Sequence, residues 1–312
     1  MDITVILCTY NRCQSLAKAL ESLAAQTLPG AVAWEVLVVD NNSKDETRTV
    51  AEDYSRLYPG RFRYLFEPQP GKSHALNAGI RDSHGDIIAF IDDDATAEPT
   101  WLQNLTSGLH GNEWAGAGGR IVPAKNISFP HWFPPDEPRL FRTLALFSCG
   151  LEPGPLTEPP LGTNMAFRKE MFDRYGGFRT DLGPCPGSEI RGEDTEFGGR
   201  ILAAGARMRY EPAAIVLHPV SPDRLRKQYF LTWWFDKGRS EFRQFGIPRD
   251  ATWFVAGVPL SLFRRLARWT LLWILSISPA RRFSCRLKVW TLAGQIVESY
   301  RHGHSRETVT AS

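Results

Sequence analysis

The sequence predicts an α/β fold in which one mostly parallel sheet is flanked by helices and followed by a C-terminal helical extension. Through about residue 122, short apolar runs alternate with helical stretches, a pattern that builds parallel sheets covered by helices. After about residue 220 the composition changes, and basic residues and tryptophans accumulate. We therefore expect a sheet domain over 1–220, a basic, Trp-rich helical extension over 221–302 and a disordered tail over 303–312.

Four strand–helix pairs make up the predicted sheet domain. The expected strands are 3–8, 34–40, 61–67 and 86–92, and the helices that follow them are 12–26, 45–58, 73–82 and 99–109. The strand sequences VILC and VLVV are almost continuously apolar. Such strands are typical of a parallel sheet that is buried on both faces.

The composition allows a large core and excludes a chain that is disordered throughout, since 43% of the 312 residues are hydrophobic. Five cysteines form no CxxC pair and show no zinc-ligand spacing, which fits a reducing compartment. The apolar run from Ile3 to Cys8 is too short for a signal peptide and lacks a basic flank. We expect a cytoplasmic protein.

Polar residues follow three of the predicted strands. In open sheets of this kind, ligands collect beyond the carboxyl ends of the strands. One polar strand end is ordinary loop chemistry, but three that converge on one sheet edge indicate a polar ligand with phosphates. The residues concerned are Thr9, Tyr10, Asn11 and Arg12, then Asp40, Asn41, Asn42 and Ser43, and finally Asp92, Asp93 and Asp94.

The three consecutive aspartates, 92–94, need a neutralising partner. Their carboxylates repel one another unless a cation or hydrogen-bond donors lie close by. Oxygen ligands suit Mg²⁺ or Mn²⁺, and these ions keep positions open for substrate phosphates. The alternative is an acidic turn or a helix cap, but a cap needs only one aspartate.

A second acidic group, Glu193 and Asp194, begins a helix whose apolar positions include Phe197 and Ile201. Acidic residues in a first helical turn are normal capping, although one carboxylate could instead take a proton from an acceptor hydroxyl. His218 closes a short apolar strand, where a lone histidine is more often structural than a ligand.

The proline-rich, aromatic segment 123–161 is either a lid or a surface loop.

Six motifs, in this order, resemble the family 2 inverting glycosyltransferases, whose GT-A fold is a Rossmann-like sheet flanked by helices. VILCTYNR is similar to the first strand and uracil-binding turn of that family, EVLVVDNNS to its second strand, PGKSHALNAGI to the helix entry beside the diphosphate, and AFIDDDA to its DXD motif. LGTNMAFRKEMFDRYGGF is similar to the strand and helix on the sugar and acceptor side, and GEDTEFGGR to the ED motif. The resemblance covers about residues 1–220.

The resemblance implies a role for each matched residue. Asp194 would be the general base, with Glu193 as its catalytic neighbour. Asp92 would contact the ribose and Asp94 the metal ion. His218 follows Asp194 by about two dozen residues, where family members often have a metal-binding histidine, so Asp94, Asp92 and His218 are the expected ligands of Mn²⁺ or Mg²⁺. The expected nucleotide and donor residues are Thr9, Tyr10, Asn11, Arg12, Asp40, Asn41, Gly71, Lys72, His74, Asn77, Asp92 and Asp93, and those on the sugar and acceptor side are Gly162, Thr163 and Asn164.

The implied reaction moves one sugar from a nucleoside-diphosphate sugar to a hydroxyl of a glycan or a lipid-linked acceptor, with inversion. A departing diphosphate develops negative charge that a bound cation stabilises, and a direct displacement needs only one base on the opposite face of the sugar. Asp40 and the DXD pattern resemble those of members that use uridine-diphosphate donors, which implies a uridine donor here and leaves thymidine and guanosine donors as alternatives. The QxxRW motif of processive members is missing, because Gln228 is followed by tryptophans at the wrong spacing.

Three other classes of protein fit less well. A sugar-nucleotide pyrophosphorylase would have a Gly-rich loop after the first strand, where this sequence has TYNR. A dinucleotide-dependent oxidoreductase needs GxGxxG, and GAGG at 116–119 lacks that spacing. A sugar-nucleotide-binding protein without transferase activity would not need both intact acidic motifs.

The extension after Val220 allows three interpretations: a helical cap that packs on the core or dimerises, an in-plane membrane anchor, or a nucleic-acid surface. From Pro219 to His302 there are fifteen Lys and Arg against five Asp and Glu. The apolar runs 251–263 and 269–280 are separated by three arginines, and each falls short of the ~20 residues of a spanning helix. Arginines beside Trp and Leu favour an anionic membrane surface over nucleic acid, and they predict peripheral attachment to the inner face of the cytoplasmic membrane.

Overall fold

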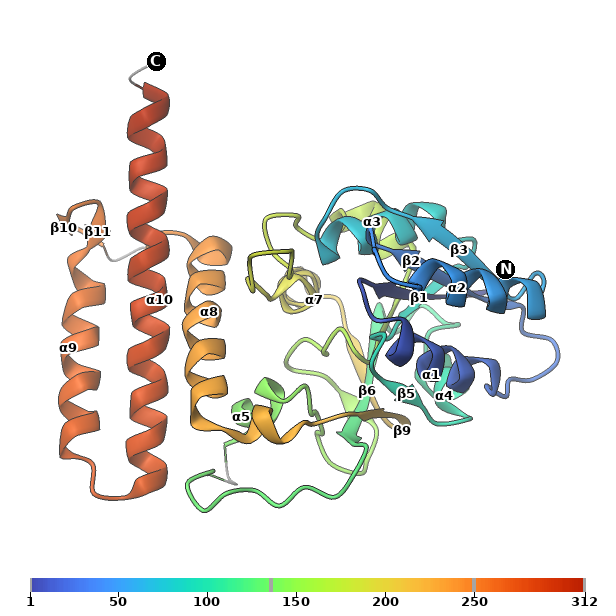
Figure 1. Ribbon diagram of the computed structural model, residues 1–312, viewed down its shortest axis with the longest axis horizontal. Coiled ribbons are helices and arrows are strands. Elements are labelled where there is room, and N and C mark those ends of the chain that lie inside the picture. Colours follow the sequence, from blue (N-terminus) through green and yellow to red (C-terminus); the bar gives the residue numbers. More distant parts are fainter. Residues whose placement is uncertain (1, 135–136, 249–250, 311–312) are drawn as a thin grey trace. The chain divides into compact units, whose positions relative to one another are not determined.

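The computed structural model describes residues 2–134, 137–248 and 251–310, with side chains up to His302 (Figure 1). The chain divides into two compact units. The sheet unit comprises Met1–Asn126, Leu144–Thr180 and Glu193–Val220, and the helical unit comprises Ile127–Thr143, Asp181–Gly192 and Ser221–Ser312. The helical unit therefore takes in two segments that precede residue 220, one of them from the proline-rich stretch at 123–161.

The sheet unit is built on a nine-stranded sheet whose path is β3-β2-β1-β4-β8-β6-β9-β5, with β7 paired to β9. β1 is parallel to β2 and β4, and β2 is parallel to β3. β8 is antiparallel to both of its neighbours, while β6 and β9 are parallel. The strands are β1 Ile3–Thr9, β2 Trp34–Asp40, β3 Phe62–Phe66, β4 Ile87–Phe90, β5 Thr96–Ala97, β6 Gly116–Pro123, β7 Gly154–Pro155, β8 Met165–Arg168 and β9 Met208–His218.

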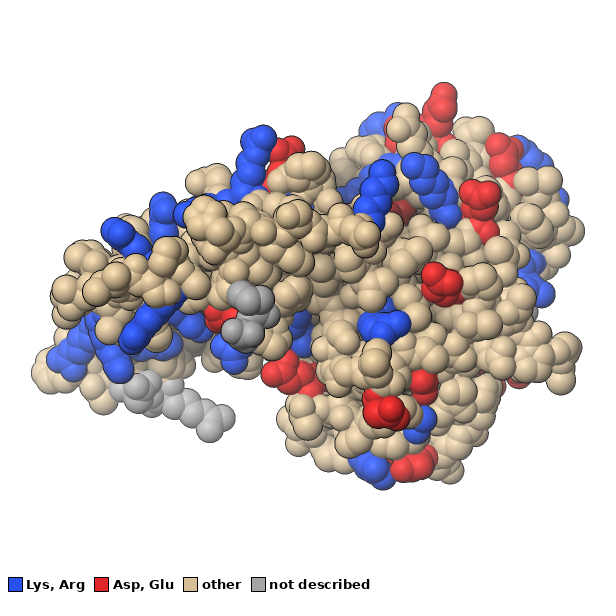
Figure 2. Space-filling view, turned by 90° about the horizontal axis from the view of Figure 1, so that it is seen from below, with Lys and Arg blue, Asp and Glu red and all other residues tan. Residues whose placement is uncertain are grey.

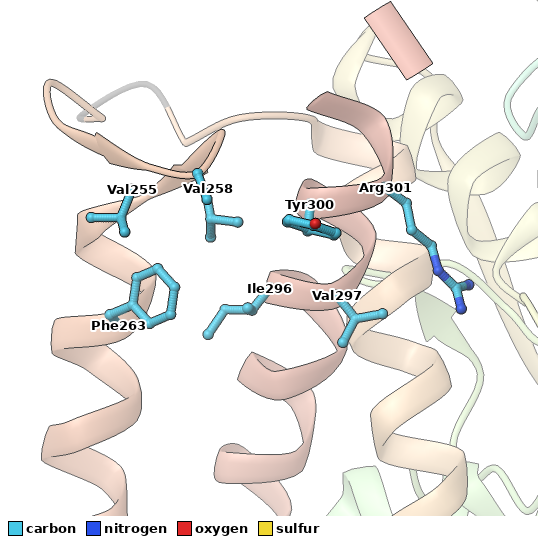
Figure 3. A pocket seen from close by; sticks show the side chains of 8 residues that line it. Val255, Val258, Phe263, Ile296, Val297, Tyr300 and Arg301 are labelled. Carbon is cyan, nitrogen blue, oxygen red and sulfur yellow. The ribbon is translucent and has the colours of Figure 1, made fainter. Parts of the chain in front are cut away.

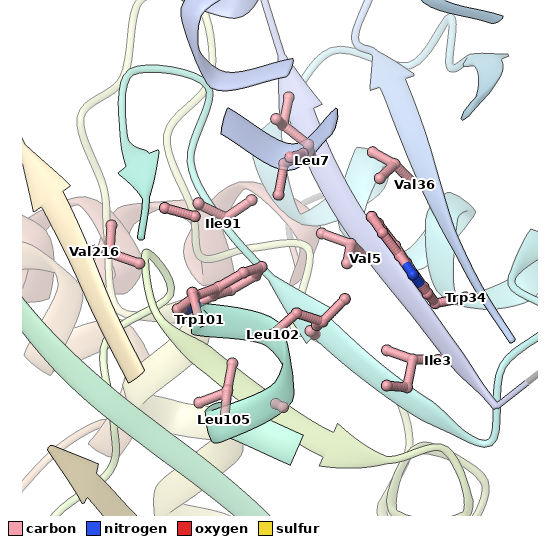
Figure 4. Packing of buried hydrophobic residues seen from close by; sticks show 14 of the residues in the cluster. Ile3, Val5, Leu7, Trp34, Val36, Ile91, Trp101, Leu102, Leu105 and Val216 are labelled. Carbon is pink, nitrogen blue, oxygen red and sulfur yellow. The ribbon is translucent and has the colours of Figure 1, made fainter. Parts of the chain in front are cut away.

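Helices cover both faces of this sheet, as the continuous apolar strands predicted. Because successive side chains of a strand point to opposite faces, Val5 of β1 belongs to a buried cluster with residues of α1, α2 and α4, whereas Ile6 belongs to a second cluster with residues of α3 and α7. Figure 4 shows the first layer, in which Trp101 and Leu102 of α4 lie against β1. The helices are α1 Cys13–Ala24, α2 Thr47–Leu57, α3 Lys72–Asp82, α4 Trp101–Thr106, α6 Glu170–Tyr175 and α7 Glu193–Ala203.

The helical unit consists mainly of three long helices, and glycines let two of them approach closely. Gly238 of α8 lies against the carbonyl of Thr291 in α10, and Gly294 of α10 lies against the carbonyl of Phe235, so neither site has room for a Cβ atom. The elements of this unit are α5 Pro138–Thr143, a 3₁₀ turn at Pro222–Leu225, α8 Lys227–Phe245, β10 Phe254–Val255, β11 Val258–Pro259, α9 Leu260–Leu275 and α10 Pro279–Thr310.

Helix α10 continues to Thr310 and so takes in most of the stretch for which we expected a disordered tail. Residues 311 and 312 lie outside the described residues. Throughout the described ranges, no helix combines the length and the apolar character that crossing a bilayer requires.

Candidate functional site

The carboxyl ends of β1, β2 and β4 bring the predicted polar residues together at one edge of the sheet. Asp40, the last residue of β2, is buried and held from two sides. Its carboxylate accepts a hydrogen bond from the Ser43 amide at 2.9 Å and another from the Tyr64 hydroxyl at 3.0 Å. This carboxylate is therefore oriented before any ligand arrives. Tyr64 lies at an inner position of β3, and the sequence reasoning missed it.

The turns after β1 and β2 are tied to each other. The Asn11 amide donates to Ser43 Oγ at 2.9 Å, and the Lys44 amide donates to Asn11 Oδ1 at 2.6 Å. Asn11 adopts a positive φ of 51°, which asparagine tolerates better than most residues. Tyr10 is 42% exposed beside it. The two turns thus form one polar surface with an aromatic ring at its rim.

Helix α3 begins at the same edge of the sheet. Gly71 precedes it with φ 130°, a conformation that favours glycine. Asn41 fixes this entry, because its Oδ1 accepts from the Gly71 amide at 2.7 Å and its Nδ2 donates to the Gln69 carbonyl at 2.7 Å. His74 lies in the first turn of α3. The N-terminus of such a helix is a favourable place for phosphate oxygens.

Lys72 connects the two predicted acidic motifs. Its ammonium donates to Asp92 at 2.7 Å and lies 3.8 Å from Glu193. Thr163 also donates a short hydrogen bond to Asp92. Burial alone would raise the pKa of the Asp92 carboxyl, but Lys72 and Thr163 outweigh burial and lower that pKa to about 2. Asp92 is therefore a charged carboxylate at neutral pH.

The other two aspartates share one arginine. Arg12 Nη1 lies 3.0 Å from Asp93 Oδ1 and 2.9 Å from Asp94 Oδ2. Burial raises the pKa of the Asp93 carboxyl to about 6 despite Arg12, and Asp94 adds to this rise. Lys72 and Arg12 thus supply part of the neutralising charge that three adjacent carboxylates require.

Asp94 also faces the end of β9. Its Oδ1 lies 3.7 Å from His218 Nε2, and the imidazole is almost fully buried. Carboxylate oxygens such as those of Asp94 suit Mn²⁺ or Mg²⁺ when phosphate oxygens and water complete the shell, and the His218 nitrogen is a further potential donor beside them. Asp92 is engaged by Lys72 and Thr163. Among the described residues, no group of three or more His, Cys, Asp or Glu side chains is arranged to hold an ion.

The predicted base lies at the start of α7. Asp194 Oδ2 accepts a hydrogen bond from the Gly162 amide at 2.7 Å, and its Oδ1 accepts from the Thr195 amide at 2.7 Å. Gly162 is followed directly by Thr163, which binds Asp92, so two consecutive residues connect the two carboxylates. Glu193 instead turns toward Lys72, and burial together with Asp194 raises the pKa of Glu193 to about 7.

The side-chain amides of two predicted site residues, Asn164 and Asn77, form hydrogen bonds within the protein. Asn164 is fully buried; its Oδ1 accepts from Trp101 Nε1 at 2.8 Å, and its Nδ2 donates to the Ala214 carbonyl at 2.9 Å. Asn77 exchanges two bonds of 2.8 Å with the backbone of Phe178. The geometry thus makes Asn164 a residue that positions the loop after Leu161, and Asn77 a residue that ties the segment at Phe178 to α3.

A separate apolar cavity of about 340 Å³ lies in the helical unit, where β10, β11, α9 and α10 meet (Figure 3). It contains none of the predicted site residues. Its lining has no carboxylate and a single cation, which does not suit a nucleotide with a metal ion. The lining residues are Val255, Ala256, Val258, Phe263, Ile296, Val297, Tyr300 and Arg301.

Comparison with known proteins agrees with this geometry. The family model described as glycosyl transferase family 2 matches residues 4–176, a range that includes Asp40, Lys72 and the three aspartates. The chain belongs to glycosyl transferase family 2. It is a glycosyltransferase, as the six motifs predicted, and not a pyrophosphorylase or an oxidoreductase.

Two curated relatives of this glycosyltransferase come from Haloferax volcanii. Glycosyltransferase AglE is 29% identical over 229 residues, which are 73% of this chain and 70% of the relative. A glucosyl-dolichyl phosphate glucuronosyltransferase is 28% identical over 223 residues, 70% of this chain and 69% of the relative.

Among solved structures, this glycosyltransferase resembles the mannosyltransferase PcManGT from Pyrobaculum calidifontis, which was determined in complex with GDP-Man and Mn²⁺. The TM-score is 0.58 at 19% identity, covering 99% of this chain and 79% of that one. The likeness confirms the predicted GT-A fold.

Proposed function

We propose that this enzyme is a metal-dependent, inverting glycosyltransferase that moves one sugar from a nucleoside-diphosphate sugar to a hydroxyl of a glycan or lipid-linked acceptor. One observation carries the proposal. The Gly162–Thr163 pair binds Asp194 through its first residue and Asp92 through its second. One short loop thereby holds both carboxylates: Asp92, which is suited to binding the sugar donor, and Asp194, which is suited to taking the proton of the acceptor hydroxyl.

The donor side of the site is prearranged for a nucleotide and its phosphates. Asp40 is fixed by Ser43 and Tyr64, so it can accept hydrogen bonds from the base, and we propose uridine. The amides that open α3 and the Lys72 ammonium favour the diphosphate. Asp94 and His218 would hold Mn²⁺ or Mg²⁺, with Asp92 on the ribose or the metal ion. When bound, the ion would stabilise negative charge on the departing diphosphate.

On the acceptor side, Asp194 is the proposed general base. Backbone amides from Gly162 and Thr195 fix both of its oxygens, and it would take the proton from the attacking hydroxyl. Direct displacement inverts the anomeric carbon, so no enzyme nucleophile is required. Glu193 shares Lys72 with Asp92, and we propose that it holds this lysine in place.

Thermal unfolding with UDP, GDP and TDP, each with Mn²⁺ or with EDTA, tests the donor site. A diphosphate at 100 times its dissociation constant should stabilise the wild type by about 2.7 kcal/mol, and EDTA should remove most of that stabilisation. With Mn²⁺ present, Asp94→Asn should gain as little stability from the nucleotide as the wild type gains in EDTA. The matched control is Asp53→Asn, an exposed carboxylate of α2 paired with Arg56, which should respond as the wild type does. A nucleotide response that EDTA leaves unchanged would contradict the metal site.

A further inference from the structure

Helix α9 leaves large apolar side chains exposed toward its C-terminal end. Of its 16 residues only Leu262 is fully buried. The exposed fractions rise toward its end and into the connection to α10: 57% for Leu271, 63% for Ile274, 65% for Leu275 and 97% for Ile277. We call these four residues the α9–α10 tip. Large apolar side chains gathered this way mark a surface that binds something.

Arginines flank the α9–α10 tip on both sides. Arg264, Arg265 and Arg268 are exposed on α9 before it, and Arg281 and Arg282 are exposed on α10 after it. From 251 to 302 the sequence has eight Lys and Arg but one acidic residue, Glu298. Figure 2 shows Lys and Arg side chains gathered over the helical unit. The tip is therefore apolar at its centre and cationic around it.

The base of the α9–α10 tip is held by aromatic packing. Trp273 of α9 and Trp290 of α10 meet edge to face at 6.0 Å, and the Arg286 guanidinium lies over both rings. Nearer the start of α10, Phe283 packs at 4.5 Å from Trp132 within the helical unit. These contacts fix the turn between the two helices, so the tip residues project outward on a preformed support.

We propose that the α9–α10 tip inserts into the headgroup region of an anionic lipid bilayer, with the five arginines on lipid phosphates. An in-plane helix of this kind buries its apolar side chains at the acyl boundary and gains from each cation near anionic lipid. A two-fold dimer through the same patch would set arginines against arginines, because such an interface is self-complementary. Nucleic acid would satisfy the arginines but would leave Leu271, Ile274 and Ile277 in water.

Bilayer attachment deepens the proposed function, and its link to catalysis rests on that function. A lipid-linked acceptor diffuses in the bilayer plane, so an enzyme held at that plane meets it at a high local concentration. Binding to lipid itself requires neither donor nor acceptor. The membrane test can therefore fail while nucleotide binding succeeds, and the reverse also holds.

Vesicle sedimentation of the full chain tests this proposal without any sugar donor. The wild type should sediment with phosphatidylglycerol–phosphatidylcholine vesicles at low salt and much less with phosphatidylcholine alone or at high salt. Replacing Ile274, Leu275 and Ile277 with serine should weaken binding by at least about tenfold. Changing Arg268, Arg281 and Arg282 to serine should remove the preference for anionic lipid. The matched control, Leu57→Ser, alters a leucine of the sheet unit that is 70% exposed and should bind as the wild type does.

Sedimentation velocity without lipid separates the alternative partners. All variants should remain folded by circular dichroism, since the altered side chains are exposed, and they should match the wild type in mass. A wild-type dimer that the serine variants convert to monomer would overturn the proposal in favour of self-association. The proposal also fails if the wild type ignores anionic vesicles at low salt, or if the triple serine variant binds them as tightly as the wild type.

Discussion

The sheet unit and the helical unit place their apolar and charged side chains in opposite ways. In the sheet unit the apolar residues of β1 and β2 are buried on both faces, and carboxylates gather at the strand ends. In the helical unit, α9 exposes leucine and isoleucine, and cations dominate its surface. The contrast teaches that apolar periodicity predicts a core only where other elements cover it. Where they do not, as at the end of α9, the same pattern leaves large apolar side chains exposed.

The largest effect should come from Asp194→Asn, which would remove the proposed base and leave the sheet intact. We expect turnover to fall by about 10²- to 10⁴-fold, because the amide cannot take the acceptor proton, while nucleoside-diphosphate affinity stays close to that of the wild type. Steady-state kinetics and calorimetric nucleotide binding would measure the two effects.

The matched control for this change is Glu196→Gln in the same helical turn. Glu196 forms an ion pair with Arg200 at 2.7 Å and has no proposed part in the chemistry. Turnover should change little. Equal losses from both substitutions would assign the effect of Asp194→Asn to the helix and not to the base.

The next largest effect should come from Gly238→Ala in the helical unit. A Cβ atom at this position would collide with the Thr291 carbonyl of α10, so the two helices must separate, at a cost of about 3 kcal/mol. Thermal unfolding should show this loss. Nucleotide binding by the sheet unit should persist below the melting temperature, and its loss would mean that the two units are less independent than the comparison implies.

Gly199→Ala in α7 provides the control for the effect of adding a methyl group. The nearest atom to a Cβ there is Pro159 Cγ at 3.8 Å, an ordinary contact. Alanine in a helix is favoured over glycine by about 0.5–1 kcal/mol, so this variant should be slightly more stable. A destabilisation like that of Gly238→Ala would point to a general cost of the methyl group.

A smaller effect is expected from Glu298→Gln. Glu298 is buried between Arg239 at 3.0 Å and Arg243 at 2.6 Å. Burial raises the pKa of this carboxyl, but the two arginines outweigh it and lower the pKa below its usual range. The ion pairs should contribute about 2 kcal/mol, which Gln would largely lose at neutral pH.

The stability lost in Glu298→Gln should depend on pH in a defined direction. Because the pKa is lower in the folded state, the stabilisation is complete above the unfolded value of about 4.3 and disappears as pH falls through the folded value. Melting temperatures of wild type and variant should therefore converge below about pH 4. A constant difference across that range would show that Glu298 acts through packing and not through charge.

The first half of the fold could be predicted closely because its strands are continuous apolar runs. β2 has the predicted bounds, 34–40, and α3 begins one residue earlier than predicted. β6 was missed, since Gly116, Gly118 and Gly119 give it little apolar signal. Those glycines leave room for Phe167, Pro160 and Asn164, which a Cβ atom would touch. Such close packing around glycines produces no periodic pattern of apolar residues in the sequence.

The sequence predicted which polar residues lie together at one edge of the sheet, but not which of them pair with each other. Strand ends identified Asp40, Arg12 and Asp92, because topology alone brings strand ends together. Charge pairing across the fold was not visible: Lys72 lies between Asp92 and Glu193, and Arg12 between Asp93 and Asp94. The three arginines that separate the two apolar runs lie within the continuous helix α9. A helix can carry cations on its exposed face without interruption.

Gly162 and Thr163 are adjacent in the chain, which fixes the distance between the two residues that hold the carboxylates. Neighbouring Cα atoms are about 3.8 Å apart whatever the rest of the protein does, and one residue holds Asp194 while the next holds Asp92. A change in the loop that carries these two residues should therefore move both carboxylates together. Substitutions that adapt the enzyme to sugars of other sizes are therefore expected among the residues around this loop, while the length of the loop stays the same.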